Sequence, residues 1–414
     1  MSETPPRDAP ARSGTAVYIL LSVMFINMVG FGIVIPLLGF YAESFQAANW
    51  QIALIFSAYS AGSFFGEPFW GRLSDRIGRR PILISTVAAN CLCYGALAFA
   101  PDVYTAMLIR FIGGMCAGNG SVMQGYIADV TAPDERSTVM SRMGAAYNIG
   151  FIIGPALGGI LVQSGQGHMG FQLPLLIASA MGGCSALGVA FFVPESRQRR
   201  VLKDEAEPSR WAMMGYAVRH PVIGRLMLLT LLVGIAFTGI ESRFPLWTKD
   251  RFGWTPRDIG ICFGVVGVVT STCQFFVTGF LSKRFGEARM LAIGMGGTAL
   301  AIGLQPFSDG GAMTVAFLAS SALCQSIAFP NSGALMSRAI DEDHQGQIMG
   351  LNNATGALAR VVGPLIAAFT TDIISHDAPF FTGALIVAPS IILAILAGRA
   401  SGQLGGARPD DRTA

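Results

Sequence analysis

The sequence predicts an all-α membrane protein of about twelve transmembrane helices, arranged in two related six-helix halves. Only 13% of the 414 residues are charged and 52% are hydrophobic. An ordinary soluble domain has about a quarter of its residues charged. Apolar stretches that come close to the length of a membrane-spanning helix recur along the whole chain, and two distant segments repeat one local pattern. The composition therefore excludes a soluble multidomain enzyme.

Apolar runs bounded by turn signals mark the individual spans. They lie near residues 15–38, 51–70, 81–100, 104–128, 139–163, 171–193, 221–247, 257–281, 288–307, 312–337, 348–372 and 378–398. Met1–Gly14 is polar and the first apolar run is too long for a secretory signal peptide, so we expect no cleaved leader. The longest polar break, Pro194–His220, separates six spans from six. We therefore expect an N-terminal half of residues 1–200 and a C-terminal half of residues 201–414.

The distribution of basic residues predicts the orientation of the chain in the membrane. If both termini are cytoplasmic, 22 of the 28 Lys and Arg residues fall on the cytoplasmic side and three lie within spans. Only Lys249, Arg251 and Arg257 remain for the opposite side. By the positive-inside rule, we expect a multi-pass protein of the bacterial inner (cytoplasmic) membrane with a cytoplasmic arm, central loop and tail.

Nothing in the sequence predicts a metal site or a cofactor. The seven cysteines fall inside apolar runs, where we expect small core residues rather than disulfides. The four histidines lie in or beside polar loops without partners at metal-ligand spacing. Gly113–Gly120 is rich in glycine but is not followed by the Lys-Ser/Thr of a phosphate-binding loop. We expect no enzymatic activity and no nucleic-acid partner.

Two segments reveal the internal repeat. Gly71–Pro81 corresponds to Gly279–Arg289 at a shift of 208 residues, and Gly154-Pro155 corresponds to Gly363-Pro364 at a shift of 209. The second shift also pairs Asp134 with Asp343 and Met140 with Met349. Parallel six-helix repeats of this kind build one large class of transporters, in which the halves rock about a central site.

The same segments resemble the major facilitator superfamily over essentially the whole chain. Gly71–Arg80 resembles its signature loop between spans two and three. Gly150–Gly159 resembles the span-five motif of its drug/proton antiporters, and Arg110 matches the span-four arginine motif. Asn27–Pro36 and Gly125–Asp129 are most similar to the tetracycline-resistance-like exporters, although those exporters usually have an aspartate at the position of Asn27.

The resemblance implies a set of gating residues. They are Gly71, Asp75, Arg76, Arg80, Asp129, Gly154 and Pro155. In the family, Asp75 would hold the cytoplasmic gate, whereas the arginines around it could serve only as topology determinants. Gly154 and its neighbours at a spacing of four also allow a neighbouring helix to approach closely.

Charged residues inside spans are costly and suggest function. The candidates for proton coupling are Glu67, Arg110 and Glu241. Two of them also have a structural interpretation: Glu67 as an arginine partner or a cap at Pro68, and Arg110 as half of a buried ion pair. For Arg243 we expect anchoring at the outer interface of the membrane.

Polar and aromatic side chains within the spans are candidates for a substrate cavity, or for hydrogen bonds that bridge helices. They are Asn27, Tyr59, Gln124, Tyr147, Asn148, Gln274, Gln325, Asn331, Asn353 and Arg360.

Together, the sequence predicts a secondary transporter, active as a monomer, that exports a small amphipathic compound by alternating access in exchange for protons. The alternative is a major facilitator importer or uniporter of a metabolite or metal chelate, which the missing aspartate at Asn27 keeps open.

Overall fold

The computed structural model describes residues 10–131, 133–163, 165–196, 210–340 and 344–402. The chain divides into two units, and each is described by itself. Unit 1 comprises Met1–Ile35 and Ala61–Lys203, and unit 2 comprises Pro36–Ser60 and Asp204–Ala414. Residues 36–60 thus belong to unit 2, although they precede the polar break that separates six spans from six.

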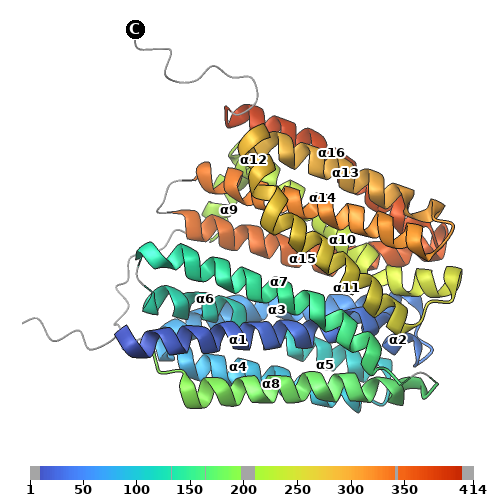
Figure 1. The fold of residues 1–414 in the computed structure, drawn as a ribbon, viewed down its shortest axis with the longest axis horizontal. Coiled ribbons are helices and arrows are strands. Elements are labelled where there is room, and N and C mark those ends of the chain that lie inside the picture. Colours follow the sequence, from blue (N-terminus) through green and yellow to red (C-terminus); the bar gives the residue numbers. More distant parts are fainter. Residues whose placement is uncertain (1–9, 132, 164, 197–209, 341–343, 403–414) are drawn as a thin grey trace, which may run out of the picture. The chain divides into compact units, whose positions relative to one another are not determined.

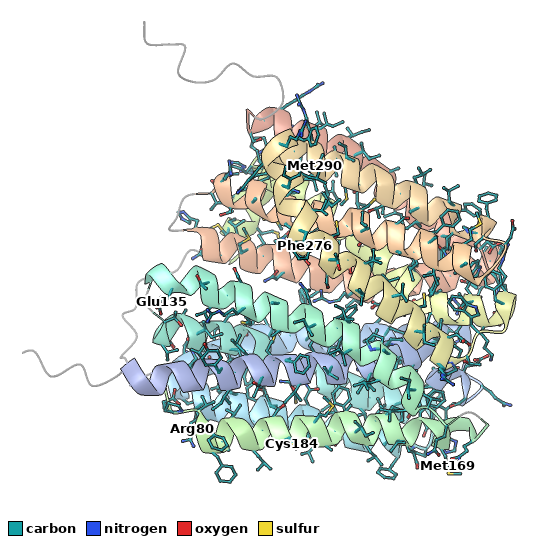
Figure 2. The ribbon with its side chains drawn as sticks, in the orientation of Figure 1. Arg80, Glu135, Met169, Cys184, Phe276 and Met290 are labelled. Carbon is teal, nitrogen blue, oxygen red and sulfur yellow. The ribbon has the colours of Figure 1, made fainter. Side chains whose placement is uncertain are left out.

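Unit 1 is a bundle of helices (Figure 1). They are α1 (Pro10–Val34), α3 (Asn49–Ile77) from Ala61 onward, α4 (Arg79–Ala98), α5 (Val103–Met115), α6 (Asn119–Val130), α7 (Pro133–Leu161), the short 3₁₀ helix η2 (Gly167–Phe171) and α8 (Gln172–Phe192). Helix α1 packs against both α7 and α8, and α4 packs against α8. Figure 2 shows Arg80 and Glu135 at one end of this bundle and Met169 at the other.

Unit 2 holds the helices of the second half together with a short piece from the first. They are η1 (Ile35–Leu37) from Pro36 onward, α2 (Leu38–Glu43), the start of α3, α9 (Arg210–Arg219), α10 (Ile223–Phe252), α11 (Pro256–Cys273), the π-helical segment η3 (Gln274–Thr278), α12 (Gly279–Phe285), α13 (Glu287–Leu304), η4 (Gln305–Phe307), α14 (Gly311–Arg338), α15 (Gln345–Ile373) and α16 (Ala378–Ala400). Helix α10 packs against α15 and α16.

Each unit contains an equivalent close contact between two of its own glycines. In unit 1 a Cβ added to Gly154 of α7 would lie 2.7 Å from Cα of Gly32 in α1. In unit 2 a Cβ added to Gly239 of α10 would lie 2.9 Å from the carbonyl oxygen of Gly363 in α15. Backbones can approach this closely only because the side chains are absent, as is common where membrane helices pack.

Among the described residues, ten helices are long and apolar enough to cross a membrane. The expected span 51–70 lies within α3, which has 29 residues. The expected continuous span 104–128 is wrong, because the helix is interrupted between α5 and α6 at residues 116–118. Four glycines at 113, 114, 118 and 120 flank or enter the interruption, and glycine is a poor helix former.

Local side-chain chemistry explains where several helices begin. The carboxylate of Asp102 accepts hydrogen bonds from the backbone N–H groups of Tyr104 (2.8 Å) and Thr105 (2.9 Å), which caps α5. These bonds stabilise the ionised carboxylate, so the pKa of Asp102 lies below its ordinary value. Thr255 and Asp258 form a capping box that begins α11.

Candidate functional site

In unit 1, α3 and α5 meet backbone to backbone. A Cβ added to Gly62 would collide with the carbonyl oxygen of Phe111, and one added to Gly66 would collide with that of Met115. The two glycines are four residues apart, so they lie on one face of α3. This contact brings the part of α3 that carries Glu67 against the helix that carries Arg110.

The interruption between α5 and α6 is filled by Trp70 of α3. Its indole N–H donates to the carbonyl oxygen of Met115, the last residue of α5, at 2.7 Å. Gly118 lies directly against the same side chain: a Cβ added to Gly118 would collide with Cβ of Trp70 and displace it. A membrane helix can be broken where protein groups satisfy the freed backbone. Broken helices are a feature of transporter binding sites.

Glu67 and Arg110 both lie in this zone. Arg110 is 3% exposed, so its side chain is buried within unit 1. Glu67 is half-buried, one helical turn from Trp70. The proton-coupling role of both residues stays a prediction.

In unit 2, Glu241 of α10 is half-buried and follows Gly239 by two residues, and Gly239 contacts Gly363 of α15, three residues after Arg360. Arg360 itself is exposed. Helices α10 and α15 pack along each other. The sequence candidates Glu241 and Arg360 are 119 positions apart in the chain, but they lie on helices that pack against each other within unit 2.

The expectation for Arg243 is wrong. Its side chain is 5% exposed, so it is packed inside the protein and does not extend outward as an anchoring side chain would. Instead its Nη1 donates to Oδ1 of Asn49, at the start of α3, over 2.7 Å. Nδ2 of Asn49 in turn donates to Asp372 of α15 over 2.5 Å. One amide thereby connects α3, α10 and α15 within unit 2.

Other polar contacts surround this amide. Nζ of Lys249 forms an ion pair with Glu43 of α2 at 2.6 Å. Oγ of Ser57 donates to the carbonyl oxygen of Val361 at 2.7 Å. We call Glu43, Asn49, Arg243, Lys249 and Asp372 the polar cluster of unit 2. Sequence reasoning missed Glu43, Asn49 and Asp372 because each lies at a helix end, where polar residues are ordinary; only contacts distant in sequence reveal them.

The substrate-cavity candidates fall in both units. Asn27, Gln124, Tyr147 and Asn148 belong to unit 1, and Tyr59, Gln274, Gln325, Asn331, Asn353 and Arg360 belong to unit 2. Gln325 and Asn331 are buried, and their amides donate to carbonyl oxygens of their own helix, α14. Tyr147, Gln124, Gln274 and Asn353 are exposed. The buried Nδ2 of Asn27 has no hydrogen-bond acceptor among the described residues.

The gating candidates in and near Gly71–Arg80 form a network in unit 1. The guanidinium of Arg79 pairs with Asp75 at 2.9 Å and with Asp129 at 3.2 Å, and donates to Oγ of Ser74 at 2.8 Å. Arg80 donates to the carbonyl oxygen of Ala190 in α8. Arg76 is exposed and Gly71 is half-buried. Sequence reasoning named Asp75 and Asp129 as gating residues but gave Arg79, the residue that joins them, only as a possible topology determinant.

Gly154 and Pro155, the remaining gating candidates, are buried where α7 contacts α1. The neighbouring positions Gly150 and Gly158 make the same kind of approach, to Phe25 and Ile33 of α1. Their role in gating stays a prediction, and their part in helix packing is visible in these contacts.

Comparisons with known proteins agree with this architecture. The family model "Major Facilitator Superfamily" matches residues 20–278 and 244–409. The tetracycline resistance protein, class C, of Escherichia coli is 30% identical over 399 residues, which cover 93% of this chain and 96% of that protein. Multidrug resistance protein 2 of Bacillus subtilis is 25% identical over 377 residues, covering 90% and 93%.

Solved structures share the fold. The bacterial homolog of the human lysosomal transporter Spinster, in an inward-facing and occupied conformation, has a TM-score of 0.74 and 14% identity, and covers 95% of this chain and 97% of that one. At that identity the likeness speaks for the fold alone. The helical bundles, the repeated glycine contacts and the two sequence relatives lead to one conclusion. This chain belongs to the major facilitator superfamily of membrane transporters, in the branch that includes the tetracycline and multidrug resistance proteins.

Proposed function

We propose that this transporter exports a small amphipathic compound across a bacterial inner membrane in exchange for protons, with both termini in the cytoplasm. The relatives named for tetracycline and multidrug resistance support the substrate class. The excess of Lys and Arg on the assigned cytoplasmic side supports the orientation.

The observation that carries the proton coupling is the position of the carboxylate Glu241 within α10, two residues after the contact of Gly239 with Gly363 of α15, the helix that carries Arg360. A carboxylate inside a membrane span is costly unless it is paired or protonated. Protonation would release Glu241 from the attraction of Arg360, and deprotonation would restore it, so the arrangement has two states that a proton can switch. Asn27 cannot take this part, because an amide does not titrate in the relevant range.

Glu67 is the second proton-carrying candidate, from unit 1. It follows Gly66, the residue in contact with α5, and precedes Pro68 within α3. A change in its charge therefore acts where α3 meets the helix of Arg110. The buried amide Nδ2 of Asn27 is suited to donate a hydrogen bond to an oxygen of the substrate.

The test uses proteoliposomes with a trapped pH indicator and an imposed pH gradient. Tetracycline, a quinolone and ethidium serve as substrates. We expect substrate movement to be accompanied by proton movement in the opposite direction. Glu241→Gln should abolish gradient-driven transport and leave exchange of substrate for substrate. Glu67→Gln is measured in parallel. The matched control is Glu135→Gln, which neutralises an exposed carboxylate of α7 outside the proposed proton path and outside the polar cluster, and should keep coupling.

Two results would overturn the proposal. Substrate movement in the wild type without proton movement would favour the importer or uniporter. Coupling that survives both Glu241→Gln and Glu67→Gln, singly and together, would remove these carboxylates from the proton path.

A further inference from the structure

The two units contain equivalent ion pairs of opposite polarity. In unit 1 the pair joins Arg79, the first residue of α4, to Asp129, near the end of α6, at 3.2 Å. In unit 2 it joins Glu287, the first residue of α13, to Arg338, the last residue of α14, at 2.9 Å. Positions 79 and 287 are 208 residues apart and positions 129 and 338 are 209 apart, which are the shifts of the internal repeat. The contact is conserved between the units, while its charges are exchanged.

The backbone before each pair is the same. Gly78 has φ 110° and ψ 157°, and Gly286 has φ 84° and ψ 151°, a region that residues with a Cβ rarely adopt. The two helices thus start from equivalent turns. The difference between the units lies in the side chains.

The two polarities are not equivalent for the helices. The N-terminus of a helix carries a partial positive charge and the C-terminus a partial negative one. In unit 2 the acid Glu287 begins α13 and the base Arg338 ends α14, so both charges are favourable. In unit 1 the base Arg79 begins α4 and the acid Asp129 is near the end of α6, so both charges are unfavourable.

Glu195, three residues beyond the end of α8, supplies the acid that α4 lacks. Its Oε1 accepts from the backbone N–H of Arg79 at 2.8 Å, and its Oε2 accepts from that of Arg80 at 3.2 Å. A Cβ on Gly78 would lie 2.5 Å from Oε2 of Glu195, so the carboxylate packs directly against this glycine, whose positive φ also favours glycine. A residue more than a hundred positions away therefore caps α4.

The residue of α6 that packs against Arg79 is also small enough to make room for the arginine. A Cβ on Gly125 would lie 2.6 Å from Cζ of Arg79, so the guanidinium occupies the space of a side chain there. The repeat position, 209 residues later, is Ala334. Unit 1 is thus adapted to the arginine in its packing as well as in its capping.

We propose that Glu195 is a positioning residue for transport: it substitutes for the helix-starting acid of unit 2 and holds Arg79 and Arg80, the first residues of α4, to the segment that follows α8. Tyr126, whose hydroxyl donates to the carbonyl oxygen of Pro194 at 2.9 Å, attaches the end of α6 to the same segment. The three helix ends α4, α6 and α8 then move together in the transport cycle. The inference requires only that the protein transports a substrate. It does not depend on which substrate or which coupling ion is used.

The test compares four proteins. The measured quantity is the transport rate of one substrate, in either direction. They are the wild type, Glu195→Ala, the polarity exchange Asp75→Lys/Arg79→Glu/Asp129→Arg, and the exchange combined with Glu195→Ala. Glu195→Ala removes two charge-assisted hydrogen bonds and should lower the maximal rate about tenfold at an unchanged KM. In the exchanged protein a glutamate at position 79 faces Glu195, so Glu195→Ala should there raise the rate or leave it unchanged.

Glu135→Ala is the matched control, since this exposed glutamate lies at the same end of unit 1 (Figure 2) and should have no effect. Hydrogen exchange of the first turn of α4 is the second measurement and remains decisive where the exchanged protein does not fold. It should accelerate in Glu195→Ala and not in Glu135→Ala. Wild-type rates of transport and exchange in Glu195→Ala, or an equal loss in both backgrounds, would overturn the inference. Failure of proton coupling would leave these readouts intact, so the two proposals are tested separately.

Discussion

Gly154 lies where the backbones of α7 and α1 approach closely in unit 1. An added Cβ would be 2.7 Å from both Cα of Gly32 and the carbonyl oxygen of Val29. These are backbone atoms, so they cannot rotate away as the end of a flexible side chain would. The residue therefore permits a contact that no other amino acid allows without moving a helix.

We expect Gly154→Ala to lower the free energy of unfolding by about 1–3 kcal/mol, the ordinary cost of overpacking a core. Gly144→Ala, on the same helix, is the control: nothing lies within 4 Å of its added Cβ. That substitution should be neutral or slightly stabilising, because alanine favours the helix. Thermal unfolding in detergent, followed by fluorescence-detected size exclusion, compares the two. Equal melting temperatures would contradict the expectation.

The broken helix between α5 and α6 matters at the scale of elements. The break falls at residues 116–118, next to the contact of α3 with α5. Its freed carbonyl at Met115 accepts from Trp70. A buried backbone carbonyl without a donor is costly, so Trp70 is what allows the chain to remain broken inside the membrane region.

Trp70→Phe keeps an aromatic ring but removes this donor. We expect a loss of about 1–3 kcal/mol of stability and faster hydrogen exchange at the end of α5. Trp50→Phe serves as the control, because Trp50 is exposed and near the other end of the same helix α3. Wild-type exchange around Met115 in Trp70→Phe would show that another group satisfies the carbonyl.

At the scale of the whole molecule, the polar cluster of unit 2 binds residues 36–60 to the helices of the second half. By sequence these residues precede the break that separates six spans from six, and α3 continues from them into unit 1. Alternating access in a transporter of two halves requires such contacts to open and close. Asn49 carries two of them, to Arg243 and to Asp372.

We expect Asn49→Ala to favour the state in which the polar cluster is open by about a hundredfold or more, because each of its two hydrogen bonds to charged groups contributes about 1.5–3 kcal/mol. The reporter is a cysteine at the buried Ser57, in a protein whose native cysteines are replaced, and the measurement is its rate of reaction with a maleimide. Gln51→Ala is the control, since the side chain of Gln51 accepts only from the nearby Ala48 N–H in the described contacts. Equal rates in Asn49→Ala and its parent would contradict this role of the cluster.

The sequence by itself determined the all-α membrane class, the repeat and the family, because the length of an apolar run and the spacing of a motif are local properties. It also identified Asp75, Asp129, Glu241 and Arg360 as residues of interest, since charges near or inside spans stand out. The contact of Arg79 with Asp75 and Asp129 shows that the segment Gly71–Arg80 takes part in a network of ion pairs.

Only the tertiary structure decided which of these residues meet. The burial of Arg243 against Asn49, the break at residues 116–118 and the capping of α4 by Glu195 join positions that are far apart in the chain. Each depends on how helices pack, and a hydrogen-bond partner leaves no periodic signal in the sequence. Both polarities of the repeated ion pair satisfy the same local pattern, so the physical difference between them emerged only once the helix ends and their neighbours were in place.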